Sequence, residues 1–346
     1  MSLSKTIGAR ARVGALLLVA LLALAGALGW GWHALMRFSS APMQIAAAGQ
    51  SIDIARGTSF KEIVKELRHR RLTHAAPFAW RLLAMRMHVT GRLHAGEYAL
   101  PPGITPRRLL QDMADGKVLQ HDFTIVDGWT FHQMLALLQR APELKHDTVG
   151  MSDATIMQRL GAPGQSPEGW FLPETYAYVK GDSDLDVLRR AYRAMKKTLA
   201  EQWSQRAQGL PLATPYDALI LASIVEKETG RADERARVAG VFVRRLEKHM
   251  LLQTDPSVIY GMGANYHGDI RKVDLTTDTP YNTYMHPGLP PTPIALPGKP
   301  AIQAALHPAS GSALYFVARG DGTHVFSDTL QEQNRNVDCY QLKHCR

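Results

Sequence analysis

The chain has 346 residues, of which 45% are hydrophobic and 21% charged, as in an ordinary globular protein large enough for more than one domain. It contains no low-complexity tract and no clear internal repeat, which argues against a solenoid protein. The formal net charge of +9 indicates a polyanionic neighbour such as nucleic acid, anionic lipid or a cell-wall polymer. Charge alone does not choose among these three.

A long apolar stretch near the N-terminus narrows the choice. Residues Val13 to Trp32 carry no charge over about the length that spans a bilayer. Basic residues are denser before the stretch (Lys5, Arg10 and Arg12) than after it (His33 and Arg37), which favours a cytoplasmic N-terminus. Trp30 and Trp32 stand where an interfacial aromatic belt is expected. We therefore expect a retained single-pass anchor over residues 13–36, with residues 1–12 in the cytoplasm and the rest of the chain outside, away from nucleic acid.

A cleaved signal peptide is the alternative to an anchor. Ala23-Leu24-Ala25 and Ala25-Gly26-Ala27 resemble processing sites, but the apolar run is long for a signal peptide and continues past both. The only two cysteines are Cys339 and Cys345, and in an exported chain such a pair suggests a disulfide. In a helix their Cα atoms would be about 9 Å apart, too far to bridge. Either the tail is irregular or both thiols stay free.

After the anchor, residues 39–50 are typical of a short linker, and small α+β units follow. The segment "SIDIARGTSFKEIVKELRHRRL" predicts a strand, a turn and a helix, and "HAGEYALPPGITPRRLLQDMADGK" predicts the same order again. Residues 45–120 loosely resemble LysM-type sugar-binding modules, although a simple spacer would have the same pattern. Residues 121–165, which include "HDFTIVDGWTFHQMLALLQ", predict one more strand–turn–helix unit as a connecting segment.

Residues 166–346 predict a mainly helical domain, so that the whole chain is of the α+β class. The segment "SDLDVLRRAYRAMKKTLAEQW" is amphipathic, and "RADERARVAGVFVRRLEKHM" has an apolar stripe of its own. Between these two segments, Thr214 and Pro215 predict the start of an apolar helix that ends in "ASIVEKETGR". Seven prolines between Pro280 and Pro300 predict a stiff irregular loop. The segment "ALYFVARGDGTHVFS" predicts a hairpin that turns at residues 320–322.

Two glutamates close the apolar helix, and helical geometry distinguishes them. At 100° per residue, Glu228 lies in the middle of the most apolar face, beside Leu221 and Ile224, and Glu226 lies roughly opposite. A carboxyl among aliphatic side chains loses hydration, which raises its pKa and suits a general acid that works near neutral pH. Glu226 is expected to be solvated. The alternative is a purely structural role for Glu228, as an ordinary carboxylate at a helix end that pairs with Arg231 or Arg235.

The segments around these glutamates contain the residue types that are typical of a sugar-binding cleft. Amides, hydroxyls and aromatic rings stand in loops rich in proline and glycine, where rings can stack on sugars and amides can bond hydroxyls. The segments are "EGWFLPETYAY", "LQTDPSVIYGMG", "YNTYMHPGLPPTPI" and "AALHPASGSALYFVA". With the anchor, the LysM-like region and "ASIVEKET", they make the chain resemble the membrane-anchored endolytic murein transglycosylases of the MltG, or YceG-like, family over nearly its whole length.

The resemblance implies a lyase reaction on peptidoglycan that needs no metal or cofactor. In related enzymes a small hydroxyl residue follows the catalytic glutamate, and Thr229 follows Glu228 in the same way. By this resemblance, Glu228 would protonate the glycosidic oxygen between N-acetylmuramic acid and N-acetylglucosamine. It would then deprotonate the muramic 6-hydroxyl, which closes a 1,6-anhydro ring. Candidate substrate-binding residues are Gln253, Asn282, Tyr284, Thr229 and Glu226. The resemblance also implies an inner-membrane site facing the periplasm, penicillin-binding proteins as partners, and a role in terminating nascent glycan strands.

Two other functions remain open from the sequence. The same cleft could use water, which would make the chain a lysozyme-like muramidase. Alternatively, the chain could be a non-catalytic, membrane-tethered peptidoglycan-binding protein in which the LysM-like region does the binding.

Overall fold

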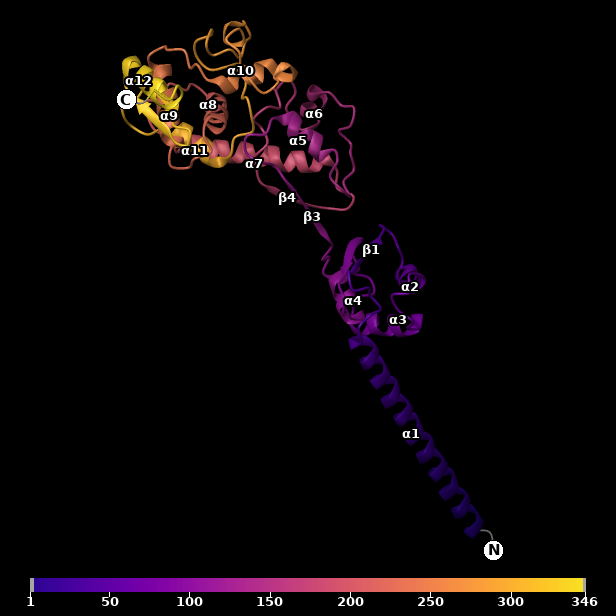
Figure 1. The fold of residues 1–346 in the computed structure, drawn as a ribbon. Helices are drawn as coiled ribbons and strands as arrows, with labels where there is room; N and C mark the ends of the chain where they lie inside the picture. Colours follow the sequence, from indigo (N-terminus) through magenta and orange to yellow (C-terminus); the bar gives the residue numbers. More distant parts are fainter. Residues whose placement is uncertain (1–2, 345–346) are drawn as a thin grey trace. The chain divides into compact units, whose positions relative to one another are not determined.

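The computed structural model describes residues 3–344, with side chains from residue 15 onward. The side chains of Lys5, Arg10 and Arg12, and the whole of Cys345, lie outside the described residues. Two compact units divide the chain, Met1–Gln120 and His121–Arg346 (Figure 1). The structure mixes helices with small two-stranded sheets, and its second unit is mainly helical, in agreement with the α+β prediction.

The first unit begins with helix α1 (Leu3–Ser40), whose segment Ala15–Ser40 is long and apolar enough to cross a membrane by length and composition. The predicted linker over residues 39–50 is not a free connection. Helix α1 continues to Ser40, and Met43 is buried while its N–H donates to the carbonyl of Ile104 at 2.8 Å. Residues 41–49 have no helix or strand, as predicted, but the apolar side chain of Met43 packs in the core of the unit.

The core of the first unit lies between one antiparallel strand pair and four helices. Strand β1 (Gln50–Ile54) pairs with β2 (Gly96–Leu100), so that Ile52 stands opposite Tyr98. Helices α2 (Phe60–His69) and α3 (Pro77–Arg86) lie between the strands in sequence, and α4 (Pro106–Ala114) follows. The two predicted strand–turn–helix units are thus confirmed as β1–α2 and β2–α4. Helix α3, which has no clear apolar period, was not predicted.

The second unit begins with a core built around two strands and three helices. Strand β3 (Gln120–Thr124) pairs with β4 (Thr175–Val179), and α5 (Phe131–Leu138), α6 (Asp153–Arg159) and α7 (Asp184–Ser204) pack against them. Residues from 123–162 share this core with residues from 171–192. The segment 121–165 is therefore packed with the rest of the second unit.

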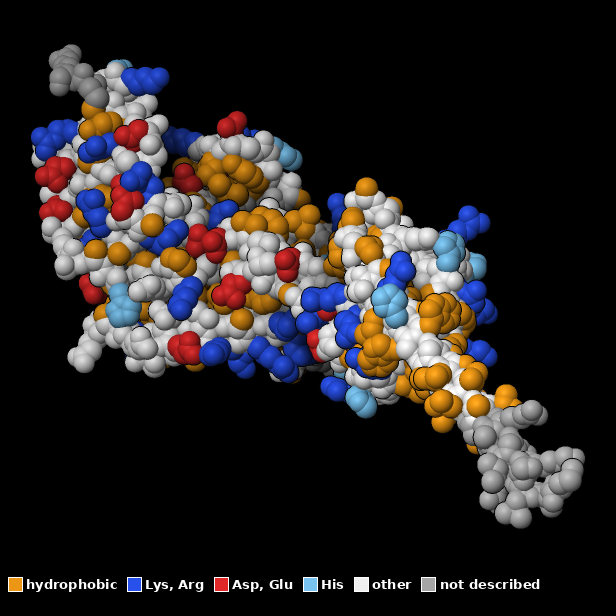
Figure 2. Space-filling view, turned by 90° about the horizontal axis from the view of Figure 1, so that it is seen from below, with side chains coloured by type: hydrophobic (Ala, Val, Ile, Leu, Met, Phe, Trp, Pro, Cys, Tyr) orange, Lys and Arg blue, Asp and Glu red, His pale blue; other side chains and the backbone are white. Residues whose placement is uncertain are grey.

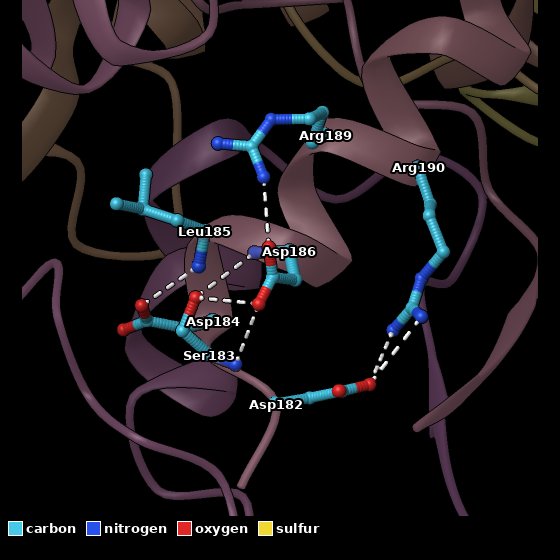
Figure 3. A network of polar contacts seen from close by, with 7 residues as sticks. All are labelled: Asp182, Ser183, Asp184, Leu185, Asp186, Arg189 and Arg190. Carbon is cyan, nitrogen blue, oxygen red and sulfur yellow. Dashed lines mark hydrogen bonds and ion pairs between the residues drawn. The ribbon is translucent and has the colours of Figure 1, made fainter. Parts of the chain in front are cut away.

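A polar network fixes the start of α7 (Figure 3). Ser183 and Asp186 form a capping box, in which each side chain accepts a hydrogen bond from the other residue's backbone N–H. Arg189 donates to Asp186 at 2.8 Å, and the fully buried Asp184 accepts from the backbone N–H of Thr148. These contacts set the position of α7, which packs against the central helix of the unit.

That central helix is α8 (Pro215–Glu228), in which every residue from 218 to 225 is buried. It packs against α7, α9 (Arg235–Glu247), α10 (Asp255–Met262) and α11 (Lys299–Leu306). The predicted hairpin is confirmed as β5 (Tyr315–Ala318) and β6 (His324–Ser327), and α12 (Leu330–Tyr340) packs on both strands. Short 3-10 turns occur at Gly263–Asn265 and Asp274–Thr276. The proline-rich segment is irregular up to residue 298, and α11 begins at Lys299, so that Pro300 lies in its first turn. Cys339, in α12, is disulfide-bonded.

Candidate active site

The site is built on the C-terminal end of α8. Thr214 caps the start of this helix in a capping box with Asp217, and Pro215 occupies the first turn. The helix ends at Glu228 because the next residue, Thr229, has extended backbone angles. Glu228 is therefore the last residue of a helix whose interior positions are buried on every side.

The carboxyl of Glu228 is held by one hydroxyl and faces a cavity. Thr254 donates a hydrogen bond from Oγ1 to Oε1 of Glu228, and Oε2 has no hydrogen-bond partner among the described residues. Burial raises the pKa of Glu228 to about 7, although the Thr254 hydrogen bond opposes the rise. The predicted direction of this shift is confirmed, and at neutral pH both protonation states of the carboxyl are populated.

Thr254 is itself fixed from the proline-rich loop. It occupies the N-cap position of α10, but its hydroxyl bonds Glu228 and does not cap the helix. Its backbone N–H donates to Thr283 Oγ1 at 3.0 Å, and Ser257 Oγ donates to its carbonyl at 2.8 Å. Sequence reasoning did not identify Thr254 or Thr283. Both lie in the quoted motifs, within "LQTDP" and "YNTY", but a Thr before Asp-Pro predicts only a helix cap, and Thr283 carried no signal of its own.

Glu228 lies in a cavity of about 410 Å³. Besides the end of α8, residues from α9, the segment before α10, the start of α10, the proline-rich loop, the β5–β6 hairpin and α12 with the residue after it line this cavity. The lining residues, besides Glu228, are Phe242, Arg245, Leu252, Gln253, Asp255, Tyr284, Phe316, Val317, Ala318, His324, Gln333, Val337 and Gln341. The cavity thus combines amide and hydroxyl groups with aromatic rings around two carboxyls, those of Glu228 and Asp255.

Two of the predicted binding residues, Gln253 and Tyr284, line this cavity with Glu228. Gln253 adopts a left-handed backbone (φ 49°), and its side-chain oxygen accepts from Arg245 Nη1 at 3.3 Å. The Tyr284 hydroxyl donates to Asp255 Oδ1 at 2.5 Å. Asp255 therefore also lies at the site.

Asn282 and Thr229 do not line the cavity. Asn282 is fully buried, and its side-chain amide donates to the carbonyls of residues 274, 275 and 277, at 3.3, 3.1 and 2.7 Å. It therefore holds the proline-rich loop in shape. Thr229 is buried too, and its hydroxyl accepts the N–H of Arg231 at 3.1 Å, which stabilises the turn after α8.

Glu226 is not solvated, contrary to the expectation from its position on the helix. Its side chain is 8% exposed, accepts the N–H of Gly298 at 3.1 Å and lies 3.9 Å from an Arg235 nitrogen. Burial raises its pKa as well. The expectation failed because α8 is enclosed on all sides, so the face opposite Glu228 packs against the start of α11 and not against water. Glu226 lies outside the Glu228 cavity.

Two buried ionic groups stabilise the walls of the cavity. Arg245 donates from Nε to the carbonyl of Leu314 at 2.7 Å and from Nη1 to the carbonyl of Leu252 at 2.9 Å, which ties the hairpin to the segment before α10. Glu234 accepts from the backbone N–H of His324 at 3.0 Å, and its other oxygen lies 2.7 Å from Nδ1 of that ring. His324 lines the cavity, and its Nε2 has no hydrogen-bond partner in the part of the chain that the structure describes.

Together these features define an acid–base site, in which one carboxyl can both give and take a proton inside a polar cleft. The chain belongs to the YceG-like family, whose sequence profile matches residues 52–339.

Known proteins of similar sequence and structure agree with this membership. The chain is 36% identical over 265 residues to a Bacillus subtilis protein named endolytic murein transglycosylase, with 71% of this chain and 72% of that one covered. A Streptococcus pneumoniae protein of the same name is 26% identical over 71% of this chain, which spans half the length of that relative. The crystal structure of a yceG-like protein from Listeria monocytogenes matches 84% of this chain and all of that one, with a TM-score of 0.54 and 28% identity.

Proposed function

We propose that this chain is a membrane-anchored endolytic lytic transglycosylase of peptidoglycan, with Glu228 as its general acid and then its base. Membership of the YceG-like family and the names of its curated relatives support peptidoglycan lytic transglycosylase activity. The assignment of Glu228 rests on its place: its carboxyl lines the cavity, its Oε2 has no hydrogen-bond partner among the described residues, and burial raises its pKa to about 7.

The proposed reaction uses a single carboxyl twice. Protonated Glu228 gives its proton to the glycosidic oxygen between N-acetylmuramic acid and N-acetylglucosamine, and that bond breaks as the leaving sugar departs. The ionised carboxylate then takes the proton of the muramic 6-hydroxyl, whose oxygen bonds C1 and closes the 1,6-anhydro ring. No water is consumed, and Glu228 ends protonated as it began. Thr254 holds Oε1 throughout, so Oε2 is the atom that transfers the proton.

Substrate contacts are proposed for the residues that line the cavity. Gln253 and Tyr284 present an amide and a hydroxyl that can bond sugar hydroxyls or an N-acetyl group, and Phe316 offers a ring face. Asn282, Thr229 and Glu226 act on binding only through the positions of the loops they hold.

A role for each remaining part of the chain completes the proposal. The strand–helix–helix–strand order of β1, α2, α3 and β2 supports a LysM-like module that holds the glycan strand. Helix α1 would anchor the chain in the inner membrane with both units in the periplasm, on the length and apolar composition of residues 15–40. There the enzyme would terminate nascent strands beside penicillin-binding proteins.

Product mass tests the chemistry directly. Purified peptidoglycan strands are digested with the full-length protein, and the new ends are weighed. We expect 1,6-anhydro ends, which are lighter than hydrolysed ends by one water. Reducing ends of full mass would favour the muramidase, and intact strands would favour the wall-binding protein.

A further inference from the structure

The first unit carries a charge that the proposed cleavage does not use. Residues 33–120 contain 13 Lys and Arg against six Asp and Glu, a net charge of +7, whereas residues 121–346 have 24 against 25. The excess of positive charge from residue 33 onward therefore lies in the first unit, in residues 33–120. Figure 2 shows Lys and Arg side chains spread over the visible face of this unit.

This unit begins within about one helical turn of the end of the apolar stretch. Trp32 closes that stretch, and Leu35, three residues or roughly 4.5 Å further along α1, is already buried in the core of the unit. Phe38 packs edge-on against Trp80, with ring centroids 5.3 Å apart. With α1 inserted in a bilayer as proposed above, the unit would lie directly on the membrane surface.

A basic cavity lies at this junction. It has a volume of about 620 Å³ and is lined by Arg86, Met87, Thr105, Arg107, Arg108 and Gln111, none of which is acidic. Arg86 lies with its guanidinium carbon 4.2 Å from the ring centroid of Trp32, at the depth where an interfacial tryptophan meets headgroups. Arg107 donates to Ser39 Oγ, near the end of α1, at 3.4 Å.

Two of the three arginines around this cavity have no carboxylate partner among the described residues. Thr105 caps α4, and Arg107 and Arg108 occupy its first turn, where the helix dipole is positive and acidic side chains are the favoured ones. Arg108 is paired with Asp112 at 2.9 Å, but Arg86 and Arg107 lie within 4 Å of no carboxylate among the described residues. A phosphate in the cavity would pair with both arginines and accept a hydrogen bond from the backbone N–H of Arg107, since Pro106 has no N–H and that of Arg108 donates to Thr105 Oγ1.

Helix α3 also presents an apolar surface beside the cavity. Phe78 is 71% exposed and Met85 44% exposed, and the two lie seven residues apart on one face of this helix, which ends at Arg86. Arg81 is exposed on the same side. Exposed aromatic and aliphatic side chains interspersed with arginines are typical of helices that lie in a membrane interface.

We propose that the first unit rests on the membrane surface and that Arg86, Arg107 and the N-terminus of α4 bind the phosphate of an anionic phospholipid headgroup. The proposal relies on the membrane anchor of the proposed function, but not on glycan cleavage. It assigns this basic face to the bilayer and leaves the rest of the unit free for the glycan strand.

The test compares lipids retained by the full-length protein. The protein in nanodiscs of equal parts phosphatidylglycerol and phosphatidylcholine is released into the gas phase for native mass spectrometry, and the bound lipids are counted. We expect the wild type to retain phosphatidylglycerol preferentially. Arg86→Gln/Arg107→Gln should lower that preference about 25-fold, since each arginine near an anionic surface contributes a factor of about five.

Matched variants separate this site from general charge and from folding. Arg56→Gln/Arg68→Gln removes two exposed arginines outside the cavity and should keep the wild-type preference. Arg86→Lys/Arg107→Lys keeps the positive charge and should keep most of the preference for phosphatidylglycerol. An unchanged preference in the first double variant, or an equal loss in the Arg56/Arg68 control, would overturn the proposal.

Two further measurements keep the proposals distinct. Sedimentation with purified sacculi should be unaffected by Arg86→Gln/Arg107→Gln, and a loss of sacculus binding with lipid preference intact would identify a wall-polymer site and overturn the lipid site. Extraction of membranes with alkaline carbonate tests the anchor separately, and glycan cleavage by the same wild-type nanodiscs tests the enzyme. Each can fail without the others.

Discussion

Thr254 and Glu228 are joined by a hydrogen bond from the threonine hydroxyl to Oε1 of the carboxyl, across 26 residues of sequence. This bond connects the end of α8 to the start of α10, and Thr283 connects the start of α10 to the proline-rich loop. Three segments thereby fix the orientation of one carboxyl. A group held in this way is oriented before substrate arrives, which lowers the entropic barrier to proton transfer.

Thr254→Val is expected to change the pH dependence of glycan cleavage. The Thr254 hydrogen bond lowers the pKa of Glu228, so its loss leaves burial less opposed and raises that pKa above about 7. A general acid loses activity as pH rises through its pKa, so the alkaline limb of the kcat profile should move to higher pH. The maximal rate should fall by about tenfold as orientation is lost. Thr254→Ser keeps the hydroxyl and is the control, so its alkaline limb and its maximal rate should match those of the wild type. An alkaline limb that does not move in Thr254→Val would contradict the role of Thr254 in setting the pKa of Glu228.

Asn282→Ala is expected to loosen the proline-rich loop. The change leaves the carbonyls of residues 274, 275 and 277 without their donor in a buried site, which should cost about 2–3 kcal/mol of unfolding free energy. Hydrogen exchange across residues 274–284 should rise with it. Tyr284→Phe, which removes only the bond to Asp255, should leave exchange nearly unchanged. A raised KM with unchanged stability and exchange would show instead that Asn282 binds the substrate.

Glu168 is expected to make stability depend on pH. It is 2% exposed, accepts the N–H of Phe131 at 3.0 Å and the hydroxyl of Tyr260 at 3.1 Å, and burial raises its pKa from 4.5 to about 7. Because the folded state holds this proton more tightly, the associated stability is complete below pH 4.5 and is lost as pH rises through 7. The loss should be on the order of 3 kcal/mol.

The Glu168→Gln variant checks that contribution. Unfolding of the full-length protein is followed between pH 5 and pH 8, and the variant should lose less stability over this range than the wild type. Exposed Glu174→Gln is the matched control and should follow the wild type. Equal losses in all three proteins would show that Glu168 titrates alike in the folded and unfolded chain.

Local patterns in the sequence predicted much of the fold. The stripe of Leu188, Met195 and Leu199 identified α7, and all three side chains are buried. The Gly320-Asp321-Gly322 turn identified the β5–β6 hairpin, in which Ala318 pairs with His324. Such patterns succeed where a helix or hairpin has one buried face, since period and turn chemistry then report the fold directly.

The same patterns failed where burial came from contacts distant in sequence. Glu226 was expected in water, but Gly298, 72 residues later, packs against it, and a helical wheel carries no information about that neighbour. Thr254 gave no sign of its bond to Glu228, because a threonine before Asp-Pro suits an ordinary helix cap equally well. The burial of Glu228 was predictable, because the period of its own helix placed it on the most apolar face, and the motif around it singled out the same residue.

The Glu228→Gln variant tests the central claim most directly. Glutamine keeps the shape of the side chain and an oxygen for the Thr254 bond, but it can neither give nor take the proton. Digestion of purified peptidoglycan strands, with 1,6-anhydro ends quantified by mass spectrometry, should show a loss of about 10³-fold relative to the wild type. Glu226→Gln, outside the cavity, is the control and should keep most of the activity. A Glu228→Gln protein that releases anhydro ends at the wild-type rate would contradict the account.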